Sequence, residues 1–372
     1  MKSLTTVIRI LTGSLFIFSG LVKAIDPLGL AYKMQEFFEV WGQTNALNSL
    51  MNGLDHYAVL FSIIMITLEV AVGVALLLGW QKKLTVWILL LLMLFFTFLT
   101  SFVLFTGKIR ACGCFGDCIP LTPVQTFTKD IILVVFVLFL LFNTKYVLPV
   151  SKPLINTLCV VAAVILTLIL QFHVIKHLPL ADCLPFKKGN NILELRKMPV
   201  DAIQDKFDYV FIYEKDGVKK DFQVTALPDS TWTFADRKQI LVEKGSNNVP
   251  VINDFSLTTE DGGDATISIL SEPGDYYLLF IKELPGNTPS WLPELRSLAE
   301  KASKGNRKLY VITGQKKLVT DFFEKNKIVN EGVVTCDVTS IKTAARANPT
   351  IFLMKGPVVQ GKWSWADFDE VE

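Results

Sequence analysis

Three of the chain's six cysteines lie in one short stretch, at Cys112, Cys114 and Cys118. A fourth, Cys183, follows further along the chain. Thiols gathered in this way can exchange between dithiol and disulfide, or they can bind a soft metal ion. Few other residues of the chain offer either chemistry, so the cysteines are the first candidates for a functional site.

The spacing leaves three interpretations open. Cys112 and Cys114 can form a redox pair, because a one-residue spacer makes a small, strained ring that is more easily reduced than a structural disulfide. Cys118 or Cys183 would then resolve a mixed disulfide. Alternatively, three thiols and a histidine bind a metal, or one disulfide is a structural staple. Four cysteines allow three connectivities, and a 112–114 pair with a 118–183 pair is one of them.

The residues around the cysteines favour the redox interpretation. Lys108 and Arg110 are basic and would favour the thiolate, which is the reactive form of a cysteine. Gly113 and Gly116 supply the backbone freedom that a small ring requires.

The composition divides the chain near its middle. The 372 residues are 51% hydrophobic, with a mean hydropathy of +0.41. Residues 1–186 contain 20 charged side chains, whereas residues 187–372 contain 52. The front half is therefore predicted to lie in a lipid bilayer and the back half to be soluble. The net charge of +2 gives no indication of nucleic-acid binding.

Five apolar segments are long enough to span a membrane, which takes about 20 residues. They cover residues 4–25, 57–80, 84–106, 127–148 and 153–175. Lys23 and Asp26 close the first segment where a signal peptide would have a cleavage site, so it is predicted to be retained. Residues 27–56 have an amphipathic face and are predicted to form a lid helix lying on the bundle.

Basic residues in the short loops predict the orientation. One end of the predicted bundle carries Lys2, Arg9, Lys82, Lys83, Lys145 and Lys152, against Lys108 and Arg110 at the other. The first end is therefore predicted to be cytoplasmic. The cysteine stretch and everything after the fifth segment would then face the periplasm of a bacterial inner membrane, where disulfides persist.

Glu69 lies inside the second apolar segment. A carboxylate in lipid is costly, so it should face the bundle interior or a polar partner. Both a role in proton movement and a structural hydrogen bond remain open. Cys159, in the fifth segment, is predicted to be a small buried hydrophobic residue. His173 and His177 share a helix face at the end of that segment and are predicted to be interface residues.

Three stretches carry a family resemblance. Residues 16–27 (FIFSGLVKAIDP), residues 73–79 after Glu69 (GVALLLG) and residues 112–116 (CGCFG) resemble the DoxX/MauE family of bacterial membrane proteins. The resemblance covers about residues 1–150 and implies a four-helix membrane core linked to disulfide formation in partner proteins. It also implies a quinone as a candidate electron acceptor. A fifth transmembrane helix, 151–178, and a large tail depart from the short members of the family.

The tail divides into a β-rich connecting segment, 179–250, and an α/β domain, 251–372. The connecting segment contains a predicted hairpin over 209–224. The α/β domain resembles thioredoxin-like proteins of the TlpA/peroxiredoxin type, with an entry hairpin over 253–264, alternating strands and helices, and Pro349 at the position of a cis-proline. It lacks the C-x-x-C motif, since residues 284–290 read LPGNTPS. Cys336 is predicted to be a core residue.

The sequence therefore predicts a membrane all-α bundle followed by an α/β thioredoxin-like domain. We expect an inner-membrane protein linked to periplasmic thiol/disulfide redox, with thiol:disulfide oxidoreductase-like activity at Cys112 and Cys114. The soluble domain would dock a periplasmic or membrane protein partner. Two alternatives remain: a non-catalytic scaffold with a structural disulfide, and a metal-handling membrane protein.

Overall fold

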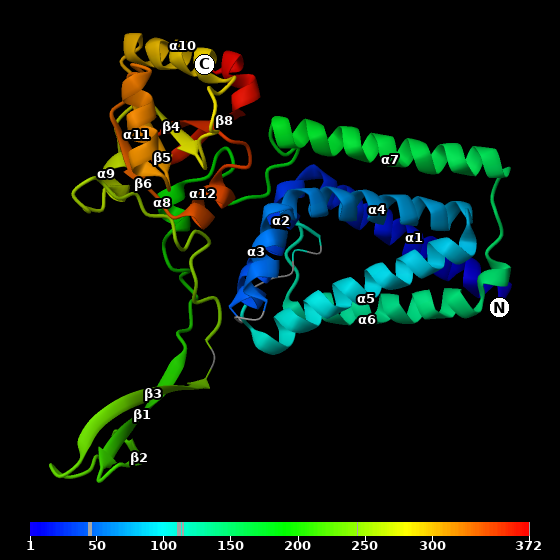
Figure 1. The fold of residues 1–372 in the computed structure, drawn as a ribbon, viewed down its shortest axis with the longest axis horizontal. Helices are drawn as coiled ribbons and strands as arrows, with labels where there is room; N and C mark the ends of the chain where they lie inside the picture. The colour runs from blue at the N-terminus through cyan, green and yellow to red at the C-terminus, as the bar shows by residue number, and fades with distance from the viewer. Residues whose placement is uncertain (44–46, 110–112, 114, 244, 372) are drawn as a thin grey trace.

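The computed structural model describes residues 1–372 apart from 44–46, 110–112, 114, 244 and 372. Cys112 and Cys114 therefore lie outside the described residues. A bundle of long helices is joined at one end to a smaller α/β body, and a thin β-arm projects from that body (Figure 1).

The bundle contains the five predicted spans. They are α1 (Lys2–Ile25), α4 (Ala58–Leu78), α5 (Lys82–Thr106), α6 (Pro123–Phe142) and α7 (Pro153–Lys176). The predicted bounds are wrong mainly for α6. That helix begins at Pro123, because the Thr122 and Gln125 side chains form a capping box there, and it ends before Asn143. Residues 143–148 form a short 3₁₀ turn, η1 (Thr144–Tyr146), and an extended stretch instead.

Glycines allow α1 and α4 to pack closely. A Cβ atom at Gly73 would lie 2.8 Å from Cγ1 of Ile17 and 3.0 Å from the carbonyl oxygen of Gly13. One at Gly20 would lie 2.5 Å from Cγ2 of Val70. Small residues at helix contacts are typical of membrane bundles, where close backbone approach replaces the hydrophobic effect as a driving force.

The predicted lid consists of two helices, α2 (Pro27–Gly42) and α3 (Asn48–His56). Asp26 caps α2 by accepting a hydrogen bond from the backbone N–H of Gly29 at 3.2 Å, and Pro27 occupies the first helical position. Phe37 and Phe38 are buried against the bundle. The opposite side of α2 faces the soluble body, so α2 lies between the two parts of the protein (Figure 1).

The arm is a three-stranded antiparallel sheet of order β2-β1-β3. Its strands are β1 (Lys206–Lys215), β2 (Val218–Gln223) and β3 (Thr233–Glu243). The predicted hairpin of β1 and β2 is confirmed, and β3 pairs with the other edge of β1. Ring contacts join Phe211, Tyr213, Phe222 and Phe234 on one face, yet every residue of β3 is exposed.

The soluble body has a five-stranded sheet of order β6-β5-β4-β7-β8. Strands β4 (Asp275–Ile281), β5 (Leu309–Thr313) and β6 (Gly332–Thr335) are parallel, and β7 (Thr350–Lys355) and β8 (Val358–Ser364) are antiparallel. This order, with a β-α-β unit before a hairpin, is thioredoxin-like, as predicted. The Asn348–Pro349 bond before β7 is cis, also as predicted.

Helices flank this sheet. They are α8 (Ile192–Leu195), α9 (Thr266–Leu270), α10 (Leu292–Lys304), α11 (Lys316–Lys325), α12 (Val338–Ala344) and the 3₁₀ helix η2 (Trp365–Glu370). The predicted entry hairpin over 253–264 is present, but it is shorter than predicted. Its two halves meet in a single bridge, Thr258–Asp264, and Thr258 also pairs with Thr335 beside β6.

The apolar clusters of the two parts are separate. One fills the bundle, and two others cover the two faces of the five-stranded sheet. Phe186 and Ile192, which follow α7, belong to the sheet cluster. Within the described residues the bundle cluster and the sheet clusters share no member, so polar contacts dominate the junction between the two parts.

Candidate functional site

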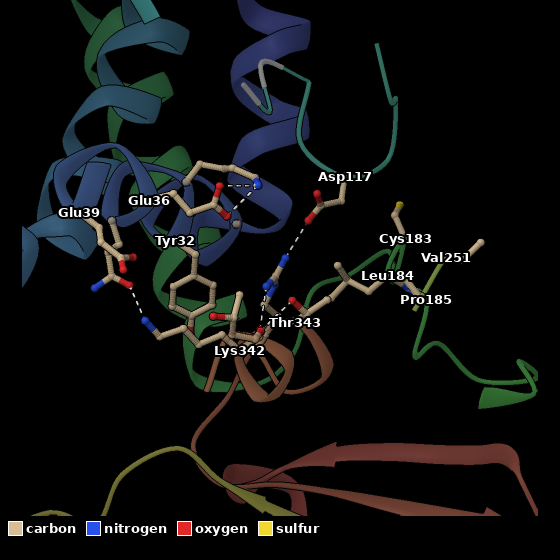
Figure 2. A pocket seen from close by; sticks show the side chains of 15 residues that line it. Tyr32, Glu36, Glu39, Asp117, Cys183, Leu184, Pro185, Val251, Lys342 and Thr343 are labelled. Atoms are coloured by element: carbon tan, nitrogen blue, oxygen red, sulfur yellow. Dashed lines mark hydrogen bonds and ion pairs between the residues drawn. The ribbon is translucent and has the colours of Figure 1, made fainter. Parts of the chain in front are cut away.

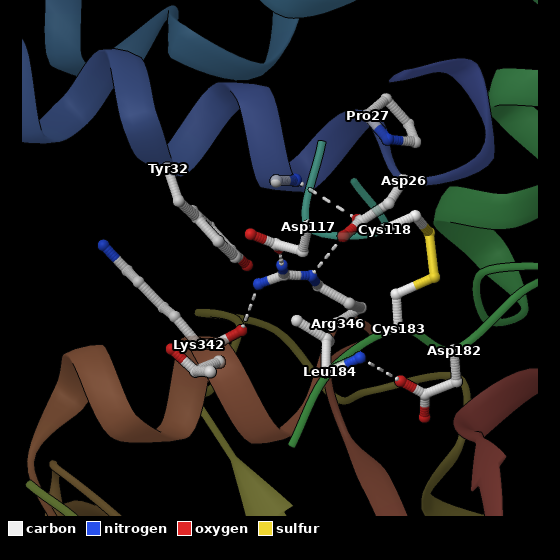
Figure 3. A network of polar contacts seen from close by, with 12 residues as sticks. Asp26, Pro27, Tyr32, Asp117, Cys118, Asp182, Cys183, Leu184, Lys342 and Arg346 are labelled. Atoms are coloured by element: carbon white, nitrogen blue, oxygen red, sulfur yellow. Dashed lines mark hydrogen bonds and ion pairs between the residues drawn. A yellow bond between two sulfur atoms is a disulfide. The ribbon is translucent and has the colours of Figure 1, made fainter. Parts of the chain in front are cut away.

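A disulfide lies at the junction. Cys118, in the loop between α5 and α6, is bonded to Cys183, which follows α7, with a Cα–Cα distance of 4.9 Å. This is the 118–183 pairing that the sequence left as one of its alternatives. The segments that carry the two cysteines meet beside the start of α2 (Figure 3).

Arg346, just after α12, is the centre of the polar network beside the disulfide (Figure 3). Its Nε donates to Oδ2 of Asp26 and its Nη2 to Oδ2 of Asp117, each at 2.7 Å. Its Nη1 donates to the carbonyl oxygen of Lys342 at 2.8 Å. Burial lowers the pKa of Arg346, but Asp26 and Asp117 raise it, and the net pKa lies above the ordinary value. The guanidinium therefore stays charged while only 6% exposed.

A second buried cation pairs with the aspartate that precedes Cys183. Lys362 of β8 donates to Oδ2 of Asp182 at 2.7 Å, and its side chain is 8% exposed. Burial lowers the pKa of Lys362, and Asp182 partly opposes that effect. Nearby, Nδ1 of His177 lies 2.6 Å from Oδ1 of Asp367 in η2. The end of α7 is thus paired with the soluble body.

Three cationic side chains of the soluble body lie close to the ring of Tyr32 in α2. Lys282, Lys342 and Arg346 lie 5.6, 5.3 and 5.4 Å from its ring centroid. Its hydroxyl accepts from Nζ of Lys282 at 2.9 Å, and Lys342 donates to Gln35 at 2.9 Å. Burial and, to a smaller extent, the charge of Arg346 lower the pKa of Lys282 to about 7. The face of α2 that is turned away from the bundle is therefore the surface that binds the soluble body.

A cleft of about 490 Å³ opens between α2 and α12. Glu36 and Glu39 line one side, Lys342 and Thr343 line the other, and Cys183 lies at its edge (Figure 2). The disulfide therefore borders a space that solvent, or an extended chain, can enter.

Glu69 does face a polar partner, as predicted. Its two carboxylate oxygens lie 3.0 and 2.7 Å from Nζ of Lys23, and the two side chains are 3% and 4% exposed. Lys23 also donates to Ser19 at 3.2 Å and lies 4.6 Å from the Phe96 ring centroid. The cavity beside this pair is about 10 Å³, roughly one water-sized probe, so a quinone ring does not fit there.

The remaining thiols are less suited to exchange. Cys159 is exposed on α7, so the prediction that it is buried was wrong; the outer helix α7 turns this residue away from its neighbours. Cys336 is 3% exposed, as predicted, and burial raises its pKa to about 12. Across the part of the chain that the structure describes, no three His, Cys, Asp or Glu side chains cluster as metal ligands. Cys118, one of the three cysteines considered as metal ligands, is bonded to Cys183.

Sequence reasoning missed the aspartates and cations of the junction. One signal was available: Asp117-Cys118-Ile119-Pro120 and Asp182-Cys183-Leu184-Pro185 are the same tetrapeptide pattern, written twice. Each aspartate pairs with a buried cation of the soluble body. The cations themselves, Arg346 and Lys362, carry no such local signal.

Comparisons with known proteins cover separate parts of the chain. Residues 207–244, which include most of the arm, match a domain of unknown function, DUF8463. Among solved structures, BsSco, a member of the Sco family of cytochrome c oxidase assembly proteins, is similar at a TM-score of 0.26 and 12% identity, covering 32% of this chain and 87% of that chain. The thioredoxin-like assignment rests on the strand order of the five-stranded sheet and not on this similarity.

The membrane part gives a firmer match. "Protein TlpB" of Flavobacterium psychrophilum is 34% identical over 144 residues, which are 37% of this chain and 37% of that protein. The chain thus spans little more than a third of the length of this curated relative. The family described as "Methylamine utilisation protein MauE" matches residues 1–143. The predicted resemblance to MauE is confirmed, and the first 143 residues of this chain are a MauE domain.

Proposed function

We propose that this protein is a multi-pass protein of the bacterial inner membrane that exchanges disulfides on the periplasmic side. Cys112 and Cys114 are the redox pair, and the thioredoxin-like domain docks the partner protein. The observation that carries the proposal is the Cys118–Cys183 disulfide, which brings the cysteine loop to the junction with the soluble domain. The match of residues 1–143 to MauE supports a membrane domain linked to thiol redox.

The proposed step is a reversible dithiol–disulfide exchange. A thiolate of the partner attacks one sulfur of the Cys112–Cys114 disulfide, forms a mixed disulfide and displaces the other sulfur as a thiolate. The partner's second thiolate then attacks the mixed disulfide. The partner leaves oxidised and the loop pair is reduced, with two electrons and two protons transferred. A quinone does not fit the cavity beside Lys23 and Glu69, so no step is assigned to one.

The charge distribution supports the orientation. The loops at the end of the bundle opposite the disulfide carry Lys2, Lys82, Lys83, Lys145 and Lys152. Arg9 belongs to the same end, where it donates to the backbone carbonyls of Leu77 and Leu148. By the positive-inside rule this end is cytoplasmic, and the disulfide end is periplasmic.

The soluble domain is suited to docking more than to exchange. The loop after β4, where a thioredoxin carries its dithiol, reads LPGNTPS over residues 284–290. Its one cysteine, Cys336, is buried with a raised pKa. Glu69 has a separate proposed role as the polar centre of the bundle or as a group that moves protons during turnover.

The test is to trap cysteine redox states in cells with a maleimide reagent that adds mass. Wild-type protein should show a loop pair that shifts between oxidised and reduced as partner dithiols are supplied or removed. The double variant Cys112→Ser/Cys114→Ser should lose that shift, and Cys159→Ser, a change on the outer face of α7, should keep it. Loop thiols that stay wholly oxidised whatever partner thiols are present would contradict the proposal.

The polar contacts between the two parts favour a second candidate, a membrane scaffold that presents the thioredoxin-like domain. Tyr32, Asp26 and Asp117 fix this domain without any thiol chemistry at Cys112 or Cys114. If the Cys112→Ser/Cys114→Ser variant folds and supports cell function fully, the scaffold replaces the redox proposal.

A further inference from the structure

We propose that the Cys118–Cys183 disulfide is a redox-controlled latch: oxidised, it holds the thioredoxin-like domain against the membrane bundle, and its reduction releases that domain. This role is independent of any exchange at Cys112 and Cys114.

The first argument is the position of the two aspartates. Asp117 directly precedes Cys118 and pairs with Arg346, and Asp182 directly precedes Cys183 and pairs with Lys362. Both ion pairs measure 2.7 Å, and both cations belong to the soluble domain. The disulfide therefore joins the two carboxylates, one paired with Arg346 (Figure 3) and the other with Lys362.

The second argument is the polar character of the junction. The bundle and the sheet have separate apolar clusters within the described residues. Two domains are expected to move relative to one another unless their interface is large and hydrophobic. Here Arg346 and Lys362 are only 6% and 8% exposed, so the docked state also carries the cost of desolvating both cations. Separation of the soluble domain from the bundle returns these charges to water. The stability of the docked state therefore depends on how well the carboxylate partners of the two cations are positioned.

The third argument is what the covalent bond supplies. Without it, Asp117 belongs to the α5–α6 loop and Asp182 to the segment after α7, and the two move independently. With it, forming one ion pair brings the second carboxylate to its cation at high effective concentration. Reduction removes this coupling and leaves contacts of Asp26, Tyr32, Gln35, Lys176 and His177 between the bundle and the soluble domain.

Reduction requires a dithiol, and the structure leaves a path for one. A thiolate of the dithiol attacks a sulfur of the bond and displaces the other cysteine as a thiolate; its second thiolate then completes the exchange. Cys118 and Cys183 end as thiols, and the reductant ends as a disulfide. Cys183 lines the open cleft between α2 and α12, where such a reagent can approach.

The test uses covalent labelling of the full chain in lipid nanodiscs, read by mass spectrometry. Phenylglyoxal reports the accessibility of Arg346, and an acetylating reagent reports that of Lys362. After reduction with dithiothreitol, labelling of both should rise at least fivefold. Arg9 and Lys23, which are 8% and 3% exposed within the bundle, serve as internal controls and should stay protected.

Variants separate the latch from other roles. Cys118→Ser/Cys183→Ser should show the high labelling without reductant, whereas Cys159→Ser should behave as wild type. Cys112→Ser/Cys114→Ser should keep the latch, so failure of the proposed exchange would leave this result unchanged. Arg346 and Lys362 that stay protected after reduction would overturn the latch. If Arg9 and Lys23 become labelled as well, the bond is a structural staple of the bundle, which also overturns it.

Discussion

The charge of Lys282 depends on the junction between the bundle and the soluble domain. Its Nζ lies 2.9 Å from the Tyr32 hydroxyl of α2 and 2.7 Å from the carbonyl oxygen of Arg346. The charged groups around it are Arg346, Lys342, Glu283 and Asp26. Burial and the charge of Arg346 together lower its pKa to about 7, which makes it a group that titrates near neutrality.

This lowered pKa predicts a pH dependence. An unfolded chain holds the Lys282 proton up to a pH of about 10.4, so between pH 7 and that value the unfolded state binds more protons than the folded state. The stability contributed at this site therefore rises with pH across that range, and below pH 7 the full cost of the buried charge is present. Tyr32 stays protonated in this window because burial raises its pKa.

The measurement is the thermal midpoint in detergent at pH 7, 8 and 9, for wild type and for Lys282→Met. We expect the midpoint of the wild type to rise relative to that of the variant as the pH increases. The limiting slope for one proton is about 1.4 kcal/mol per pH unit. Parallel pH profiles for the two proteins would show that Lys282 is not the titrating group.

At the scale of elements, α1 and α4 depend on each other through the Lys23–Glu69 pair. Glu69→Gln removes one charge and leaves Lys23 buried without its partner, which typically costs about 3–5 kcal/mol. Replacing both residues, as in Lys23→Met/Glu69→Leu, should recover most of that loss, because a buried ion pair is often worth no more than a packed apolar pair.

Denaturation of the purified protein in detergent micelles would measure both variants, with Ser62→Ala, which removes a different buried hydrogen bond to Pro27, as a matched control. A double variant as unstable as Glu69→Gln alone would contradict the pairing argument. If the double variant is stable yet fails to cycle thiols, Glu69 has the proposed role in proton movement.

Sequence patterns predicted the helices and strands better than the tertiary contacts between them. Apolar length alone located all five spans, and alternation located the first hairpin of the arm. The end of α6 was misjudged because Val147 is apolar and fully buried while lying outside any helix. The ion pairs of Arg346 join residues that are 320 and 229 positions apart, and no local pattern encodes such a pairing. The repeated Asp-Cys dipeptide indicated two related positions but not the cations they bind.

At the scale of the whole molecule, the β-arm is separable from the rest. Its base is closed by two backbone hydrogen bonds between Ile203 and Ser246, at 2.8 and 3.0 Å, and Asp205 accepts from the N–H of Gly245 at 2.6 Å. No described arm residue belongs to the apolar clusters of the bundle or the five-stranded sheet. The arm is therefore an appendage whose folding adds nothing to those clusters.

Replacing residues 206–243 with a short glycine-containing turn should thus leave the thermal midpoint unchanged or slightly raised. Shortening a flexible connection from about forty residues to about four lowers the free-energy cost of closing that loop by roughly 2 kcal/mol at most. Scanning calorimetry of the shortened and full-length proteins would measure the effect, and protection of Arg346 from phenylglyoxal would show that the junction is intact. A large drop in the midpoint would mean that the arm stabilises the fold through contacts outside the described residues.

The bond between Cys118 and Cys183 also constrains how the chain is threaded. The covalent ring that it closes contains α6 and α7, two membrane crossings. A bond between two loops forms only when both sulfurs reach the same compartment, so the number of crossings between them must be even. A chain that fails to insert α7 leaves the sulfurs on opposite sides of the bilayer and stays linear. Closure of the ring, visible as faster migration on a non-reducing gel, is thus a covalent record that the last two helices were inserted with the correct parity.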